Sequence, residues 1–150
     1  RDVALTLSDS FCVDRYRDEF LDLIRSGTVD LLFANEHELK SLYQTADFNT
    51  ALSAVRAQAR RAVVTRSAKG ALAVAGSETA EVAACPIDNL VDTTGAGDLF
   101  AAGFLFGSTA GYKPEACLRL GALAASHVIQ TLGARPQVSL RQLAIDNGLI

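Results

Sequence analysis

The sequence of 150 residues contains no methionine and no tryptophan, and only three cysteines and two histidines. The cysteines, Cys12, Cys85 and Cys117, are odd in number and far apart, and no C-x-x-C pair is present. The absence of a C-x-x-C pair and the sparse histidines argue against a zinc site. These features favour a reducing, cytoplasmic setting.

The sequence also lacks a charge bias and a long hydrophobic run. The formal net charge is -3, and acidic and basic residues are interspersed, so no nucleic-acid partner is expected. The basic cluster at 56–61 is typical of the solvated end of a helix. The longest strongly apolar stretch, 99–107, is about half of the roughly 20 residues that a membrane span requires, so no membrane partner is expected either.

Apolar residues make up 49% of the sequence and alternate between strand-like and helix-like patterns. Because Arg1 leads at once into a strand-like run and methionine is absent, we expect a fragment of about one domain. Asp14 is the predicted N-cap and Gly27 the predicted end of the first helix, and Ser139 and Gln142 have the spacing of a capping box. Strands are predicted at 3–8, 29–34, on both sides of a turn near 69–70 within 62–76, and at 79–85; helices are predicted at 13–27, from 35, at 49–60, from 95, at 114–133 and after 139. This alternation predicts a parallel or mixed sheet with helices on both faces.

One stretch, "VDTTGAGDLFAAGF" at 91–104, changes from small polar residues to an apolar helix. Backbone N–H groups at a helix start lack partners and carry partial positive charge. Because Gly95 and Gly97 have no side chains, an anion can approach the amides of Ala96, Gly97 and Asp98 closely. The stretch is neither a Walker loop nor a G-x-G-x-x-G turn. It predicts a site for a phosphate or for the charge of a transferring phosphoryl group.

Asp98 lies directly beside this predicted anion site. A carboxylate there repels phosphate unless it has another task, and the obvious task is to accept a proton from an attacking hydroxyl. The simpler interpretation is that Asp98 caps the helix, where an acidic residue is favourable in any case. The residues alone leave both interpretations open.

The longer segment "DTTGAGDLFAAGFL" resembles the second signature of the ribokinase-like carbohydrate and nucleoside kinases, the phosphofructokinase B family. The resemblance implies that Asp98 is the catalytic base and that Gly95, Ala96 and Gly97 form the anion hole. It also implies MgATP as cosubstrate. The fold it implies is an α/β, Rossmann-type three-layer sandwich with a central, mostly parallel sheet.

Two further sets of residues resemble the metal-binding positions of this family. "FANEHE" resembles its N-x-x-E motif, so Glu38 is expected to hold Mg²⁺ through water and Asn35 to lie near the triphosphate. The same spacing is that of a capping box, and both interpretations can hold together. Asp92 and Thr94 match positions that bind a monovalent cation such as K⁺, together with carbonyl groups at 131–135. The alternative for Asp92 is a turn-forming role.

Four more positions are expected to border the nucleotide. "VVTRSAKGALAV" resembles the strand and turn that lie against it, with Thr65 and Gly70 matching and Ser67 standing where the family usually has glycine. "AASHVIQTLGA" resembles the helix and loop beside adenine. Ala122 stands there where relatives often have Asn or His, so only apolar and backbone contacts are expected from it.

The resemblance covers nearly the whole sequence but only the C-terminal half of a usual member. Residues 1–150 are then the nucleotide-binding part of a kinase that needs an N-terminal substrate and lid half, and the family allows a homodimer. The expected reaction is transfer of the γ-phosphoryl group of MgATP to a primary hydroxyl of a sugar or nucleoside. "SDSFCVDRYRDEF" favours the adenosine kinase-like members. The alternatives are a catalytically silent nucleotide-binding regulatory module and a dinucleotide-dependent oxidoreductase, and the missing G-x-G-x-x-G argues against the second.

Overall fold

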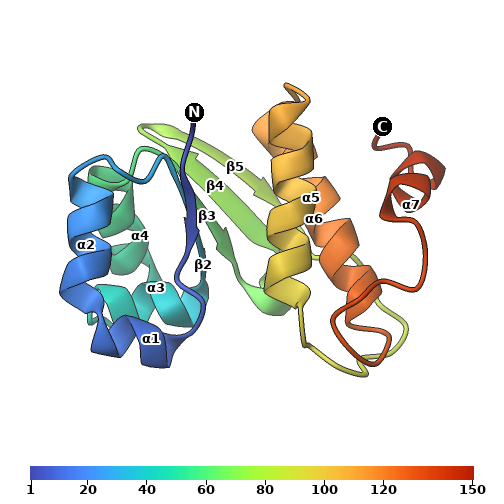
Figure 1. The fold of residues 1–150 in the computed structure, drawn as a ribbon, viewed down its shortest axis with the longest axis horizontal. Coiled ribbons are helices and arrows are strands. Elements are labelled where there is room, and N and C mark those ends of the chain that lie inside the picture. Colours follow the sequence, from blue (N-terminus) through green and yellow to red (C-terminus); the bar gives the residue numbers. More distant parts are fainter. The chain divides into compact units, whose positions relative to one another are not determined.

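The computed structural model describes all residues, 1–150, and they fall into two units. Unit 1 consists of Arg1–Arg66 and Leu72–Ala80, and unit 2 of Ser67–Ala71 and Glu81–Ile150. The elements in chain order are β1 (Ala4–Thr6), α1 (Ser10–Arg15), α2 (Arg17–Arg25), β2 (Leu31–Asn35), α3 (Glu36–Leu42), α4 (Phe48–Gln58), β3 (Ala62–Thr65), a 3₁₀ turn (Ser67–Lys69), β4 (Ala71–Ala75), β5 (Glu78–Val82), α5 (Ala96–Thr109), α6 (Pro114–Val128) and α7 (Leu140–Asp146) (Figure 1).

The strands form one five-stranded sheet in the order β1-β2-β3-β4-β5. The first three strands are parallel, with Ala4 opposite Leu31 and Leu32 opposite Ala62. Helices connect these strands, as the alternating sequence pattern predicts. The links from β3 to β4 and from β4 to β5 are too short for a parallel crossover, so both are hairpin connections and the sheet is mixed.

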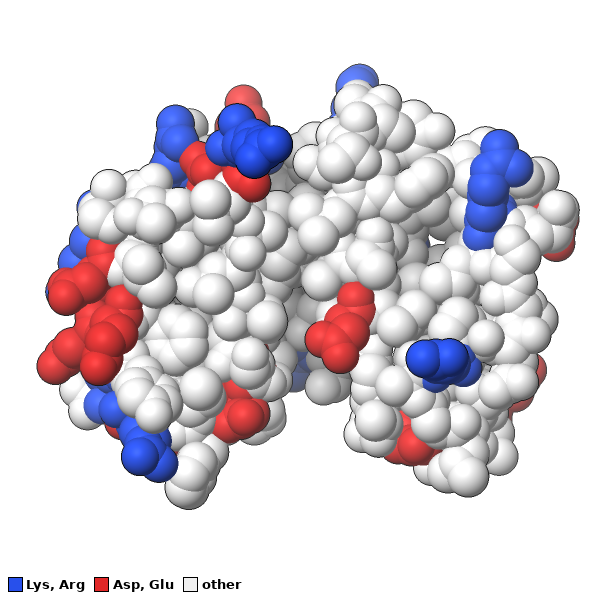
Figure 2. All heavy atoms as spheres, viewed as in Figure 1, with Lys and Arg blue, Asp and Glu red and all other residues white.

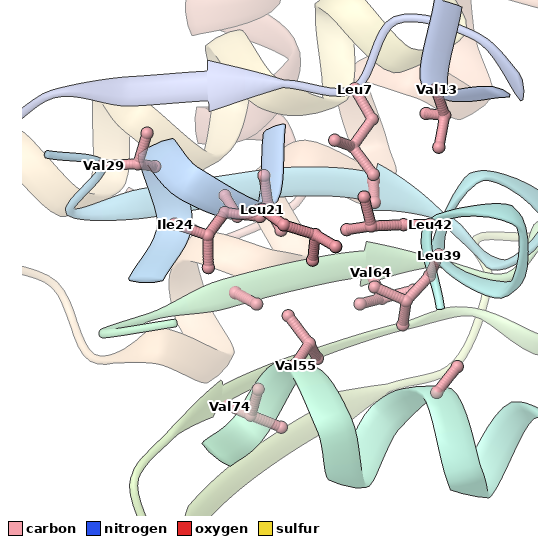
Figure 3. Close-up of a cluster of buried hydrophobic side chains, with 14 of the residues drawn as sticks. Leu7, Val13, Leu21, Ile24, Val29, Leu39, Leu42, Val55, Val64 and Val74 are labelled. Atoms are coloured by element: carbon pink, nitrogen blue, oxygen red, sulfur yellow. The ribbon is translucent and has the colours of Figure 1, made fainter. Parts of the chain in front are cut away.

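The hydrophobic core of unit 1 lies between the sheet and helices α1–α4, which cover one of its faces (Figure 1). Figure 3 shows how the side chains of Leu21 and Ile24 from α2, Leu39 from α3 and Val55 from α4 gather beside Val64 of β3. Ile24, Leu39, Val55 and Val64 are at most 1% exposed. Burial of apolar area of this kind is the main force that holds α/β layers together.

The first helical segment departs from its prediction. The helix expected at 13–27 is interrupted at Tyr16, where φ is -123° and ψ is 34°. The N-cap is Asp9, whose side chain accepts a hydrogen bond from the Cys12 N–H, so the prediction of Asp14 as the cap was wrong. Asp14 lies within α1 and pairs with Arg17. The predicted end at Gly27, with φ of 73°, is confirmed.

In unit 2, α5 and α6 pack closely because glycines remove side chains where the helices meet. A Cβ at Gly103 would lie 2.6 Å from the Leu120 carbonyl oxygen, and one at Gly121 would lie 2.7 Å from that of Phe100. No helix of the structure is long and apolar enough to cross a bilayer. In the view of Figure 2, acidic and basic side chains are interspersed and form no continuous basic surface.

Two helix boundaries of unit 2 differ from the sequence prediction. α6 ends at Val128 rather than near 133, because the N–H groups of Gln130 and Thr131 bond to carbonyls three residues back and close the helix. At α7, Ser139 caps the helix by accepting the Gln142 N–H, as expected. The Gln142 side chain instead donates to Asp146, so only half of the predicted capping box forms.

Candidate functional site

The glycine-rich turn at the start of α5 is fixed by its own geometry and by a neighbouring loop. Gly95 is the N-cap with φ of 79°, a left-handed conformation that favours glycine. A Cβ at Gly95 would lie 2.7 Å from the Ala134 Cβ. The N–H groups of Val91 and Asp92 both donate to the Ile129 carbonyl. The turn therefore rests on the loop that follows α6.

The carboxylate of Asp92 connects the turn before α5 to the loop after α6 through hydrogen bonds. Oδ1 accepts hydrogen bonds from the Thr94 N–H at 2.9 Å and the Thr94 hydroxyl at 2.6 Å, and Oδ2 accepts the Gly133 N–H at 2.9 Å. The hydrogen bond from the Thr94 hydroxyl contributes most, and together the three bonds hold the pKa of Asp92 below its usual range. The turn-forming interpretation of Asp92 is thus confirmed. The same bonds bring the loop at 131–135, whose carbonyls the cation prediction requires, to this carboxylate.

Two backbone amides at the start of α5 are available to an outside anion. The Ala96 N–H, which was expected to join them, donates instead to the Thr93 carbonyl at 3.2 Å and closes the turn. The N–H groups of Gly97 and Asp98 have no acceptor within the chain, as the start of a helix dictates. Of the three amides that the sequence predicted to form an anion hole, two are therefore free of partners within the chain.

Asp98 occupies the third position of α5, and its side chain is exposed. Its carboxylate accepts no hydrogen bond within the chain, so it does not cap the helix by bonding to a backbone N–H. Of the simpler interpretation, in which Asp98 caps the helix, only the favourable interaction of its negative charge with the helix dipole remains. An unpaired carboxylate next to two unpaired amides is suited to accept a proton from a group that approaches an anion bound there.

A second group of candidate residues lies in unit 1, at the carboxyl ends of β2 and β3. Asn35 and Glu38 form a complete capping box, in which the Glu38 N–H donates to Asn35 Oδ1 and the Asn35 N–H donates to Glu38 Oε2, each at 2.8 Å. Asn35 Nδ2 also donates to Glu38 Oε1 at 2.8 Å. Thr65 stands opposite Asn35 in the sheet register. The capping interpretation is confirmed, and it holds the Glu38 side chain at the helix start.

Glu38 is 6% exposed, which is unusual for an acidic residue. Burial raises its pKa, the Asn35 N–H opposes this shift, and the negative charge of Asp9 adds to it. No three histidine, cysteine, aspartate or glutamate side chains lie close enough together to hold a metal ion. Because Mg²⁺ is usually bound through water and phosphate oxygens rather than by an all-protein cage, a single carboxylate such as that of Glu38 is compatible with it.

The remaining candidate residues, Ser67, Gly70 and Ala122, each have a role in the fold itself. Ser67 begins the 3₁₀ turn with φ of 51°, which explains why glycine suits this position. Gly70 has φ of 89°, and a Cβ there would lie 2.0 Å from the Val82 carbonyl oxygen. Ala122 is buried in α6 at 9% exposure. Contact of these residues with a nucleotide stays a prediction.

The structure thus brings the candidates together in two sets. Unit 1 gathers Asn35, Glu38 and Thr65, and unit 2 gathers the turn at 92–98. Sequence reasoning missed Gly133 and Ala134 as supports of that turn, although "LGARP" marks a loop. It also missed Asp9, whose charge acts on Glu38 and whose only sequence signal was its position after the first strand.

Residues 2–140 match the pfkB family carbohydrate kinase. The chain belongs to this family. A probable sugar kinase from Rhizobium etli is 56% identical, with a TM-score of 0.99 over 100% of this chain and 46% of that one. An adenosine kinase from Sinorhizobium meliloti is 53% identical, with a TM-score of 0.96 over 98% of this chain and 45% of that one.

A ribokinase from Arabidopsis thaliana, solved with ribose and ATP, is 28% identical, with a TM-score of 0.74 over 95% of this chain and 47% of that one. The ribokinase-like α/β fold class predicted from the sequence is confirmed by these likenesses. The chain spans less than half the length of each of these relatives.

Proposed function

We propose that residues 1–150 form the nucleotide-binding and catalytic part of a kinase that transfers the γ-phosphoryl group of MgATP to a primary hydroxyl of a sugar or nucleoside. The observation that carries the proposal is the exposed, unpaired carboxylate of Asp98 beside the unpaired N–H groups of Gly97 and Asp98. Membership of the pfkB family supports it.

In the proposed reaction, Asp98 accepts the proton of the acceptor hydroxyl as that oxygen bonds to the γ-phosphorus. The bond from the γ-phosphorus to the bridging oxygen breaks, and ADP leaves with the electron pair. The amides of Gly97 and Asp98 stabilise the charge on the transferring group, and removal of one such donor typically costs 10²–10³-fold in rate. General-base catalysis typically contributes another 10²–10⁴-fold.

In the same proposal, the triphosphate of ATP is held with the help of Asn35, Glu38 and Thr65. Mg²⁺, when bound, neutralises charge on the phosphate oxygens. Glu38 would hold it through water, and Asn35 keeps the Glu38 carboxylate in place with two hydrogen bonds. Ser67, Gly70 and Ala122 are proposed to border the nucleotide.

A monovalent cation at Asp92 and Thr94 is also proposed. The two residues and the carbonyls at 131–135 offer the hard oxygen ligands that K⁺ accepts. The lowered pKa of Asp92 keeps its carboxylate charged, which such a cation requires. Equal turnover in K⁺ and in tetramethylammonium would refute this site.

For the acceptor, we propose a nucleoside of the adenosine type, in a reducing cytoplasmic setting. The Sinorhizobium meliloti adenosine kinase is 53% identical, whereas the Arabidopsis thaliana ribokinase solved with ribose is 28% identical. The three cysteines are free, which suits a reducing compartment. The acceptor and lid contacts are proposed to come from a further part of the kinase, since the polar residues gathered at 35–38 and 92–98 are all assigned to the nucleotide, the metal and the transferring group.

The experiment compares the isolated chain with a chimera, defined as the Sinorhizobium meliloti adenosine kinase in which residues 1–150 replace the matching part. We expect the isolated chain to bind ATP weakly in calorimetry and to phosphorylate neither adenosine nor ribose. The reason is that positioning an acceptor contributes roughly 7–11 kcal/mol, which the isolated chain lacks. We expect the chimera to phosphorylate adenosine. A chimera that binds ATP without turnover would refute the kinase proposal and favour a regulatory module.

A further inference from the structure

Arg66 lies where β3 ends and the turn that is proposed to border the nucleotide begins. β3 ends at Thr65, and the 3₁₀ turn starts at Ser67, whose carbonyl accepts the Gly70 N–H at 3.0 Å. Ser67 has a φ of 51°, and a residue other than glycine keeps such a conformation only where its surroundings hold it there. Support for this conformation therefore has to come from neighbouring residues.

The guanidinium of Arg66 is held by side chains of two helices. Its Cζ lies 4.0 Å from the centre of the Phe48 ring, at the start of α4, and its Nε donates to Glu36 Oε2 at 3.1 Å, at the start of α3. The Arg66 and Glu36 side chains are only 20% and 17% exposed, so solvent screens this pair less than a pair in open water. Arginine can make both contacts at once, because its planar fork lies over a ring while it donates from its edge, and the compact ammonium of lysine cannot do the same.

The ion pair extends the pairing of β2 and β3 by one residue beyond the sheet. Asn35 and Thr65 are register partners, and Glu36 and Arg66 are the residues that follow them. The pair therefore connects the capping box that begins at Asn35 with the backbone from which the turn at 67–70 starts.

We propose that Arg66 is a positioning residue for ATP. Its contacts with Glu36 and Phe48 keep the backbone at Ser67 in the conformation in which the turn receives the nucleotide. This proposal rests on the proposed function, which places the turn beside the nucleotide. Because Glu36 and Phe48 engage the guanidinium, Arg66 acts through the backbone of the turn and not by touching ATP.

The test measures the ATP dissociation constant by calorimetry, and kcat at saturating ATP, in the chimera defined above. Arg66→Leu should raise the dissociation constant about tenfold, as the loss of one partly desolvated cation–π contact can. It should leave kcat within about threefold of the parent, because the contact serves binding and not the chemical step. Arg60→Leu is the matched control, since Arg60 pairs with Asp30 at the opposite ends of β2 and β3, and it should leave ATP affinity unchanged.

Ser67→Gly distinguishes the proposed role from a general loss of stability. Glycine adopts a positive φ without strain, so in the Ser67→Gly background Arg66→Leu should weaken ATP binding by no more than about threefold. Arg66→Lys keeps the charge but not the planar fork, and its ATP affinity should lie between those of the parent and Arg66→Leu.

Three results would overturn the proposal: ATP affinity of Arg66→Leu within about threefold of the parent, an equal loss of affinity in Arg60→Leu, or an equal loss with and without Ser67→Gly. If Arg66→Leu does not fold, Arg66→Lys takes its place, and parental ATP affinity of that variant overturns the proposal as well. Calorimetry does not require turnover, so an inactive chimera in which Arg66→Leu weakens ATP binding counts against the proposed function alone. A parent chimera that binds no ATP would overturn both.

Discussion

Replacing Gly97 with alanine should stabilise the fold and at the same time impair phosphoryl transfer. Of the eleven glycines, only Gly97 has neither a positive φ nor a protein atom within 4 Å of an added Cβ. Nothing in the fold therefore requires glycine there, and alanine is favoured over glycine in a helix by about 0.5–1 kcal/mol. A methyl group beside the two free amides would, however, hold a phosphoryl group away from them. The expected loss in kcat is about 10²–10³-fold, the value of one such donor.

The assay pairs urea unfolding of residues 1–150 with adenosine turnover by the chimera. Ser53→Ala, at an exposed position of α4, is the matched control that gains helix propensity away from the site. Gly95→Ala is the contrasting variant, because its Cβ would lie 2.7 Å from Ala134 Cβ, so it should lose stability as well as activity. If Gly97→Ala gains stability and keeps turnover within about threefold of the parent, no anion approaches these amides and the reasoning is refuted.

Three other outcomes follow from the packing and the charges. Gly121→Ala should lower the free energy of unfolding by about 1–3 kcal/mol, since its Cβ would lie 2.7 Å from the Phe100 carbonyl, and an unchanged urea midpoint would contradict the close packing of α5 on α6. Ser67→Gly should raise that free energy by about 1 kcal/mol because φ is 51° there, and a loss of stability would show that the serine side chain compensates. Because the pKa of Asp92 is lowered in the folded chain, its carboxyl binds fewer protons there than in the unfolded chain. The hydrogen bonds to Asp92 therefore stabilise the fold fully above the usual pKa of 3.8, and this stabilisation is lost as the pH falls through the pKa of the folded state. Asp92→Asn should reduce the acid-dependent loss of stability in urea unfolding, and an identical pH profile would contradict the assigned hydrogen bonds.

Much of the fold could be predicted because local patterns determine it. Apolar runs between turn residues marked the strands, and the Asn35–Glu38 spacing marked a capping box that forms as expected. The break at Tyr16 was not predictable, because apolar residues at helical spacing continue across it. The early end of α6 serves a contact between Gly133 and Asp92 that is remote in sequence.

The candidate site shows the same division between local and remote causes. The motif at 91–104 located the turn and Asp98, because the chemistry needs small residues and a carboxylate in one short stretch. The loss of the Ala96 amide to the Thr93 carbonyl depends on the turn geometry that Gly95 sets. The support from Ala134 depends on packing between loops. Neither of these leaves a signal in residue spacing.

The most direct measurement of the central claim is the effect of Asp98→Asn in the chimera on adenosine turnover and on ATP affinity. The change keeps the size of the side chain and removes only its charge at the helix start, so the free energy of unfolding should fall by no more than about 1 kcal/mol and the ATP dissociation constant should stay the same. Turnover should fall by about 10²–10⁴-fold or more, because the proton of the acceptor hydroxyl loses its base. Turnover within a few-fold of the parent chimera, with ATP affinity intact, would contradict the assignment of Asp98 as the catalytic base.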